Sequence, residues 1–194
     1  MKKVLLVIYN SFSEFEITVA TAMLRSSYQV VTISDTYEKV TGESGLQFVP
    51  HLTYKDVDPA EYEAIIIPGG DLFNIKDTEE LYELTKTFHD MNKLLASICS
   101  GTYVLARAGV LQGNPYTVTL QKEQRKFLGC FEEECFHYEP VVKWDKVITA
   151  QGHAYVDFGL AIAEHLDAIS NKEFIREFYN GTRNRLMEDA MTQA

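Results

Sequence analysis

The chain has 194 residues, of which 46% are hydrophobic, and its formal net charge is −10 at pH 7. This length and apolar content suit a single domain spanning residues 1–194, with a sizeable buried core. The negative charge argues against a nucleic-acid binder, which would carry a basic patch, and against affinity for anionic membranes.

The start of the chain carries two lysines and then an apolar run, residues 1–10. The run is too short for a signal peptide with a cleavage site and is typical of a first buried strand. No apolar stretch of the sequence approaches membrane-spanning length. The three cysteines are odd in number. With no export signal, we expect reduced thiols and a cytoplasmic location.

The first half of the chain alternates apolar strands with amphipathic helices. A helix capped by Ser13 and carrying Phe15 and Val19 on its apolar face is expected after the first strand. This alternation predicts a parallel sheet with helices on both faces. The expected elements are strands at 3–9, 28–34, 63–67 and 94–98, a short hairpin within 37–54 and a helix over 78–91.

The second half is less regular. The pattern predicts a helix with Phe158 and Ile162 on one face, and an amphipathic segment containing Phe174 and Phe178. The polar tail from Thr182 is expected to fray. The remaining expected elements are a strand at 116–120, a helix at 121–128 and short strands at 141–142 and 147–150.

The most informative stretch is residues 94–102, where an apolar run ends in Cys99 and continues with Ser100 and Gly101. A buried strand that enters a tight turn before a helix is typical of a nucleophile elbow, which lifts one side chain to the C-terminal edge of the sheet. A helix N-terminus also lowers the pKa of a thiol. The pattern therefore predicts a reactive Cys99. The alternative is a cysteine that only packs between strand and helix.

A glycine pair is expected at the same edge of the sheet, because the strand at 63–67 runs into Pro68-Gly69-Gly70-Asp71. Glycines allow backbone N–H groups to approach a substrate oxygen closely. Together with the amide of Ser100, the pair would form an oxyanion hole. Without the cysteine elbow opposite it, Pro-Gly-Gly would be an ordinary loop.

Three segments in this order resemble a known family. Residues 67–71 (IPGGD), 96–101 (ASICSG) and 152–162 (GHAYVDFGLAI) are similar to the ThiJ/PfpI superfamily. This group is related to class I glutamine amidotransferases and includes the parkinsonism-associated protein deglycase. The resemblance covers most of the chain. It implies a flavodoxin-like three-layer αβα sandwich with a mainly parallel sheet, usually dimeric, in which Cys99 is a nucleophile or an oxidation-sensitive thiol.

The resemblance also assigns a carboxyl group to the sulfur. Glu16 falls where the family has a carboxyl hydrogen-bonded to the cysteine, and Glu14 is the alternative. A protonated Glu16 would donate to a thiolate, whereas an ionised one would take the thiol proton, and the sequence leaves both open. A first-turn acid would also stabilise the helix dipole without any catalytic role.

Histidine is where the chain departs from the family. Protease-like members carry a histidine directly after the cysteine, and this chain has Ser100 there. The branch of the parkinsonism-associated deglycase has a nearby histidine where this chain has Gln121. His153, at a strand-to-helix junction, is then the candidate base for Cys99. The alternative is that His153 caps or packs against the helix that follows.

No metal or cofactor is expected. Cys130, Cys135 and His137 do not have the spacing of a structural zinc site, and no fourth ligand is evident. The sequence also lacks a Walker-type or dinucleotide-binding glycine pattern.

Two functions fit these residues. The first is a small-molecule hydrolase, or a glyoxalase- or deglycase-type enzyme, in which Cys99 attacks an electrophilic carbonyl or amide carbon with help from Glu16 and His153. The second is a non-enzymatic stress or redox sensor in which Cys99 oxidises to a sulfenic or sulfinic acid. An intracellular protease is less favoured. The expected partners are a small-molecule substrate and a second copy, through the apolar face near Phe174 and Phe178.

Overall fold

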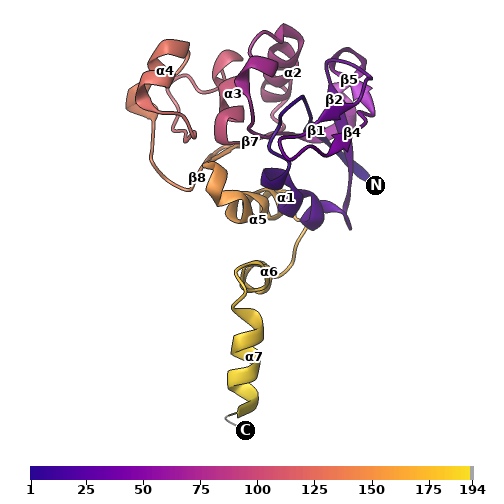
Figure 1. Ribbon diagram of the computed structural model, residues 1–194, viewed down its shortest axis with the longest axis vertical. Coiled ribbons are helices and arrows are strands. Elements are labelled where there is room, and N and C mark those ends of the chain that lie inside the picture. The colour runs from indigo at the N-terminus through magenta and orange to yellow at the C-terminus, as the bar shows by residue number, and fades with distance from the viewer. Residues whose placement is uncertain (193–194) are drawn as a thin grey trace.

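The computed structural model describes residues 1–192 and contains a seven-stranded sheet between two layers of helices (Figure 1). The strands of this sheet are β1 (Lys2–Val7), β2 (Tyr28–Ser34), β5 (Leu52–Thr53), β6 (Tyr62–Ile67), β7 (Leu94–Ile98), β8 (Val141–Trp144) and β9 (Val147–Ala150). The helices are α1 (Phe15–Leu24), α2 (Glu79–Asp90), α3 (Thr102–Arg107), α4 (Lys122–Leu128), α5 (Tyr155–His165), α6 (Lys172–Tyr179) and α7 (Arg183–Thr192).

The sheet has the order β5-β2-β1-β6-β7-β9-β8. Every neighbouring pair is parallel except β8 and β9, which are antiparallel. Helices α1 and α5 cover one face, and α2 and α3 cover the other (Figure 1). This is the parallel sheet with helices on both faces that the alternating pattern predicted, and it has the flavodoxin-like three-layer architecture that the family resemblance implied. The predicted hairpin also forms, with β3 (Val40–Thr41) antiparallel to β4 (Gln47–Phe48).

The central strands are apolar at nearly every position because helices cover both of their faces. Val4, Leu5 and Val7 of β1 and Ile65 and Ile66 of β6 are all fully buried. Burying a side chain of this size contributes about 1.5–3 kcal/mol relative to leaving it exposed. The strands therefore form a rigid base for whatever lies at their C-terminal edge.

The buried surface of helix α1 is wider than the apolar face that the sequence predicts. Phe15 is 50% exposed, whereas Glu16 is 2% exposed, because α1 is enclosed between the sheet and α5. The predicted N-cap is wrong: Glu14 holds that position, and Ser13 Oγ donates to Glu43 Oε2 at 2.6 Å instead. The packing of α1 thus carries a carboxyl group into the interior.

Two expectations for the second half are wrong. Residues 116–120 form no strand, and only Tyr116 makes a bridge, to Phe136. Thr117 N–H donates to the side chain of Thr149 at 2.9 Å, so a side chain replaces the strand partner that this segment would need. The tail after Thr182 forms α7, which leads away from the body of the molecule (Figure 1). None of the helices within residues 1–192 has the length and apolar content needed to cross a membrane.

Candidate active site

Cys99 lies at the C-terminal end of β7, in the middle of the sheet. Its φ is +57°, and the 3₁₀ turn η4 (Cys99–Gly101) carries the chain directly into α3. A non-glycine residue with positive φ is uncommon and strained, and such residues gather at functional sites. This is the strand, turn and helix order of the predicted elbow. Cys99 is only partly buried, while Ser100 beside it is 6% exposed.

The buried carboxyl group of α1 faces this sulfur. Glu16 Oε2 accepts a hydrogen bond from Gly69 N–H at 2.8 Å, and the carboxyl lies beside Cys99, because both side chains pack against Gly69 and Gly152. Glu14 has a different environment, because its carboxylate accepts from both the N–H and the hydroxyl of Ser44. The structure therefore places Glu16, and not Glu14, at the cysteine.

Glycines at two positions make this approach possible. A Cβ on Gly69 would lie 2.5 Å from Cys99 Cβ and 2.8 Å from Glu16 Oε2. A Cβ on Gly152 would lie 2.9 Å from Glu16 Oε1 and 3.2 Å from Cys99 Sγ. Cβ atoms in proteins essentially never come within 3.0 Å of a non-bonded atom, so a side chain at either position would force its neighbours to move. The two glycines therefore pack the thiol and the carboxyl group together from two sides.

Burial governs the protonation of the pair. Desolvation raises the pKa of Glu16 to about 7, and the nearby charge of Glu43 adds to the rise. The hydrogen bond from Gly69 N–H lowers the pKa but does not offset the desolvation. Desolvation, followed by the charge of Glu16, raises the pKa of the Cys99 thiol to about 12. The amide of Ser100 works in the opposite direction by donating to the sulfur. At neutral pH the thiol keeps its proton and Glu16 is close to its midpoint.

The expected lowering of the thiol pKa is therefore wrong. That expectation considered only the helix N-terminus after Cys99. Helix α3 spans only Thr102–Arg107, and the turn η4 separates it from the sulfur. Removal of water and the facing carboxylate outweigh a dipole of this length.

The structure does not bring His153 to the sulfur. Its side chain is exposed, and among residues 1–192 no hydrogen bond joins it to Cys99 or Glu16. The cause is the 3₁₀ turn η6 (Gly152–Ala154), in which successive side chains point about 120° apart. Gly152 faces the sulfur, so the next residue faces solvent.

Thr119 lies beside the Cys99 sulfur, where the family pattern led us to look for a histidine. Its hydroxyl is a hydrogen-bonding neighbour of Cys99, accepts from Gly152 N–H at 2.8 Å and donates to Gln151 Oε1 at 3.0 Å. Gln121, the position considered from the family pattern, is exposed at the start of α4. The sequence carried no signal for Thr119, because it lies in a segment without regular structure.

Two of the three N–H groups assigned to an oxyanion hole already have partners. Gly69 N–H donates to Glu16 Oε2 at 2.8 Å, and Gly70 N–H donates to Ser100 Oγ at 3.0 Å. Ser100 Oγ also donates to the Gly70 carbonyl at 2.8 Å. Gly69 therefore positions the carboxyl group. Gly70 would face a substrate oxygen only after the Ser100 hydroxyl turns away.

Cys99 opens onto a cleft of about 900 Å³. One wall comes from the turn after Gly70 and the other from α4. Phe73 and Phe127 are the most exposed aromatic side chains of these walls, at 78% and 89%. The charged side chains of the lining are those of Glu43, Asp71, Lys76 and Glu123. Such a cleft has the size of a small-molecule site.

We expect Gly69→Ala to disturb this site without any change in charge. The added methyl group must displace Cys99 or Glu16, and overpacking of this kind costs about 1–3 kcal/mol. Urea unfolding should show that loss, together with slower alkylation or turnover at Cys99. A variant that keeps its stability to within about 0.5 kcal/mol would show that the glycine is not required for packing.

With this geometry described, comparison with known proteins decides the family. The model of the DJ-1/PfpI family matches residues 2–165, which include Glu16, the glycine pair, the elbow and Gly152. The chain belongs to the DJ-1/PfpI family. The match ends with α5, so α6 and α7 lie beyond it.

Relatives within the DJ-1/PfpI family carry several names. An uncharacterized protein of Methanocaldococcus jannaschii is 33% identical over 85% of this chain and 82% of its own length. A deglycase of Thermococcus kodakarensis is 32% identical over 61% of this chain and 72% of its own. The crystal structure of a DJ-1 superfamily protein of Agrobacterium tumefaciens superposes with a TM-score of 0.84 at 26% identity, over 93% of this chain and 99% of that one.

Proposed function

We propose that this protein is a cysteine-dependent enzyme of the hydrolase or glyoxalase/deglycase type, acting on small molecules with an electrophilic carbonyl or amide carbon. The observation that carries the proposal is a strained cysteine on an elbow, beside a buried carboxyl group, at the base of an open cleft. Relatives named deglycase, at about 30% identity, support the same chemistry. A thiol that only filled the core would not need the cleft.

The first step follows from the protonation of the pair. The Cys99 sulfur uses a lone pair to form a bond to the carbonyl carbon, and the π electrons of the C=O bond move to its oxygen. The thiol proton passes to the carboxylate of Glu16, which returns it to that oxygen or to a leaving amine. Because the pKa of Glu16 is about 7, the carboxyl group accepts and returns a proton readily near neutral pH. Gly70 N–H and the Ser100 hydroxyl hold the oxygen once the bond between them opens.

The lining of the cleft predicts a preference against anions. The lining contains three acidic residues and one lysine, so a negatively charged substrate meets net repulsion there. We expect kcat/KM for methylglyoxal to exceed that for glyoxylate by about fivefold, because like charges at an exposed site interact by up to about 1 kcal/mol. Salt should reduce the ratio, and Glu43→Gln should lower it. An equal rate for both compounds, at low and high salt, would contradict this preference.

Turnover tests the proposed function. The purified protein is assayed with methylglyoxal, with glycated amines, and with panels of amides and esters, and Cys99 oxidation is followed by mass spectrometry at low peroxide. Turnover that requires Cys99 supports an enzyme. Absence of turnover on every panel, together with ready uptake of oxygen by Cys99, would overturn it in favour of the sensor.

The redox-sensing function keeps one supporting observation. Among residues 1–192 no histidine contacts the sulfur, so the protease-type Cys–His pair is missing. A protonated Glu16 would donate a hydrogen bond to an oxidised Cys99 and stabilise it. The raised pKa of the Cys99 thiol, about 12, does not separate the two functions, because thiolate is both the better nucleophile and the form that peroxide oxidises.

A further inference from the structure

The walls of the cleft at Cys99 carry the two most exposed phenylalanines within residues 1–192. Phe73 lies in the 3₁₀ turn η3 (Leu72–Asn74) on one wall, and Phe127 lies on α4 on the other. A single exposed phenylalanine on a convex surface needs no explanation. Two of them, on opposite walls of a concave site with a strained cysteine at its base, are placed to contact whatever enters the site.

Hydrogen bonds of the backbone hold the first wall without using the Phe73 ring. Asp71 N–H donates to the Ser11 carbonyl at 3.1 Å, and Asp71 Oδ1 accepts from Phe73 N–H at 3.0 Å. The Lys76 ammonium lies 4.9 Å from the centre of the Phe73 ring. These bonds fix where the turn presents Phe73, while most of the ring stays in solvent. Packing of the fold therefore does not account for a phenylalanine at this position.

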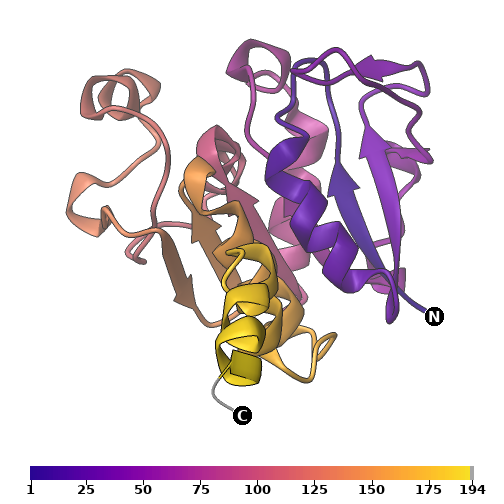
Figure 2. The same ribbon diagram turned by 60° about the horizontal axis from the view of Figure 1, so that its bottom comes forward.

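Helix α4 is likewise held by residues other than its phenylalanine. The buried Arg125 guanidinium pairs with both carboxylate oxygens of Glu133, at 2.7 and 2.9 Å, and its Nη1 donates to the Leu120 carbonyl at 2.6 Å. The helix stands out from the sandwich between two loops (Figures 1 and 2). Both walls are thus fixed before any ligand arrives, which lowers the entropic cost of binding between them.

The cleft is larger than a substrate such as methylglyoxal requires. Its volume of about 900 Å³ is near the upper end of the roughly 300–1,000 Å³ range of small-molecule sites. Leu72, Leu120 and Leu128 also line it. A small dicarbonyl at Cys99 would leave these side chains and both phenylalanine rings in water. A flat apolar substituent would contact the rings instead, because aromatic rings pair edge to face or offset.

We propose that Phe73 and Phe127 form an aryl-binding subsite, which selects carbonyl substrates that carry an uncharged aryl group beside the reacting carbon. This selection rests on the proposed function for the chemistry at Cys99 and adds the class of substrate, of which the arylglyoxals are the simplest members. The aryl group occupies the space between the two walls, while the carbonyl carbon lies at the sulfur.

Turnover of phenylglyoxal and methylglyoxal tests the selection. Wild type should have the higher kcat/KM for phenylglyoxal. In the double variant Phe73→Ser/Phe127→Ser the ratio of the two values should fall about tenfold, because two aromatic contacts are lost. The difference in intrinsic reactivity between the two compounds cancels when the ratios are compared. Most of the change should be in KM, since the ring contacts are the same in the ground and transition states.

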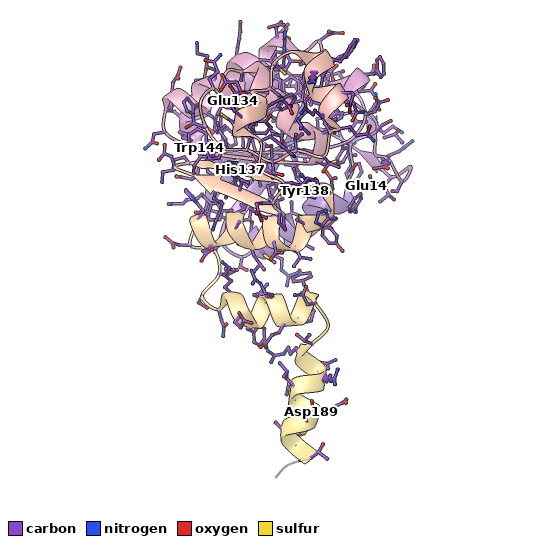
Figure 3. All side chains as sticks on the ribbon, turned by 90° about the vertical axis from the view of Figure 1, so that its left-hand side faces the viewer. Glu14, Glu134, His137, Tyr138, Trp144 and Asp189 are labelled. Carbon is purple, nitrogen blue, oxygen red and sulfur yellow. The ribbon has the colours of Figure 1, made fainter. Side chains whose placement is uncertain are left out.

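Phe178→Ser is the matched control. Phe178 is also an exposed phenylalanine, but it lies on α6 and does not line the cleft. Figure 3 shows α6 and α7 outside the sandwich. This variant should keep the wild-type ratio to within about twofold, as expected for an exposed residue away from the site. An equal fall in the control and in the double variant would contradict selection by the cleft walls.

Alkylation of Cys99 tests the subsite without any turnover. The probes are iodoacetamide and N-benzyliodoacetamide, in which the sulfur forms a bond to the same carbon and iodide leaves, so only the aryl group differs. Peptide mass spectrometry follows the rate at Cys99, normalised to the rate with glutathione. Wild type should prefer the benzyl reagent about tenfold, and the double variant should lose this preference. Cys130, which does not line the cleft, should show none.

The two measurements separate the subsite from the proposed function. Labelling of Cys99 without preference for the benzyl reagent, or a preference that Phe73→Ser/Phe127→Ser retains, would overturn the subsite. Turnover with an unchanged ratio in that variant would also overturn it and would leave the proposed function standing. A benzyl preference that depends on the two phenylalanines, with no turnover of any dicarbonyl, would support the subsite and remove the proposed function.

Discussion

Cys99→Ser is expected to lower kcat/KM by roughly a thousandfold or more, with little effect on stability. The hydroxyl of serine fits the space of the thiol, but its proton is harder to remove and the buried carboxyl of Glu16 is too weak a base for it. Removing the nucleophile of a catalytic unit typically leaves only the contribution of binding and oxyanion stabilisation. The measurement is steady-state turnover on the best substrate of the panel, together with thermal unfolding.

Cys130→Ser provides the matched control. Cys130 is also partly buried and burial also raises its pKa, but it does not line the cleft. We expect this variant to keep its turnover to within about twofold, which is the range of substitutions away from a site. A Cys99→Ser protein that retained most of its activity would mean that the chemistry uses another group.

Glu16→Gln is expected to lower kcat/KM by roughly a hundredfold, because an amide cannot take the thiol proton. In wild type the rate should rise as the pH increases through about 7, where the carboxyl group loses its proton and becomes a base. The variant should lose this rise. Glu14→Gln is the matched control, since it changes a neighbouring buried carboxyl that bonds to Ser44 and not to the sulfur.

Glu16→Gln should also change how the free energy of unfolding depends on pH. The folded-state pKa of Glu16 lies above its ordinary value of 4.5, so the folded chain holds this proton more tightly than the unfolded chain. That contribution is fully present below about pH 4.5 and is lost as the pH rises through about 7, with a total of about 3 kcal/mol at most. Urea unfolding between pH 5 and 8 should show this decline in wild type and not in Glu16→Gln. Equal slopes for both proteins would contradict a buried, titrating Glu16.

The two carboxyl groups show how far the sequence reached. Glu14 and Glu16 are both acids at the start of one helix, and no local rule separates them. The family resemblance favoured Glu16, and the structure supports that choice through Gly69 and Cys99. The physical cause is the burial of α1 on two sides, which points one acid at the sheet and the other at the turn before β4.

Histidine and threonine show where sequence reasoning stopped. His153 lies at the strand-to-helix junction where the sequence predicted a base for Cys99, but a 3₁₀ turn directs its side chain to solvent and leaves Gly152 against the sulfur. Thr119 reaches the thiol from a segment that was expected to be a strand. Side-chain direction within a turn and the path of an irregular segment depend on hydrogen bonds to residues far along the chain, such as that between Thr119 and Gln151.

The sequence by itself determined the sandwich and the elbow at Cys99, because strand and helix periodicity and the small residues of a tight turn are local properties. Only the tertiary structure decided the state of that cysteine. The pKa of the thiol is raised, not lowered, because distant segments remove water and bring Glu16 to the sulfur. The same holds for the tail after Thr182, which was expected to fray and which forms helix α7 beyond the folded body (Figure 1).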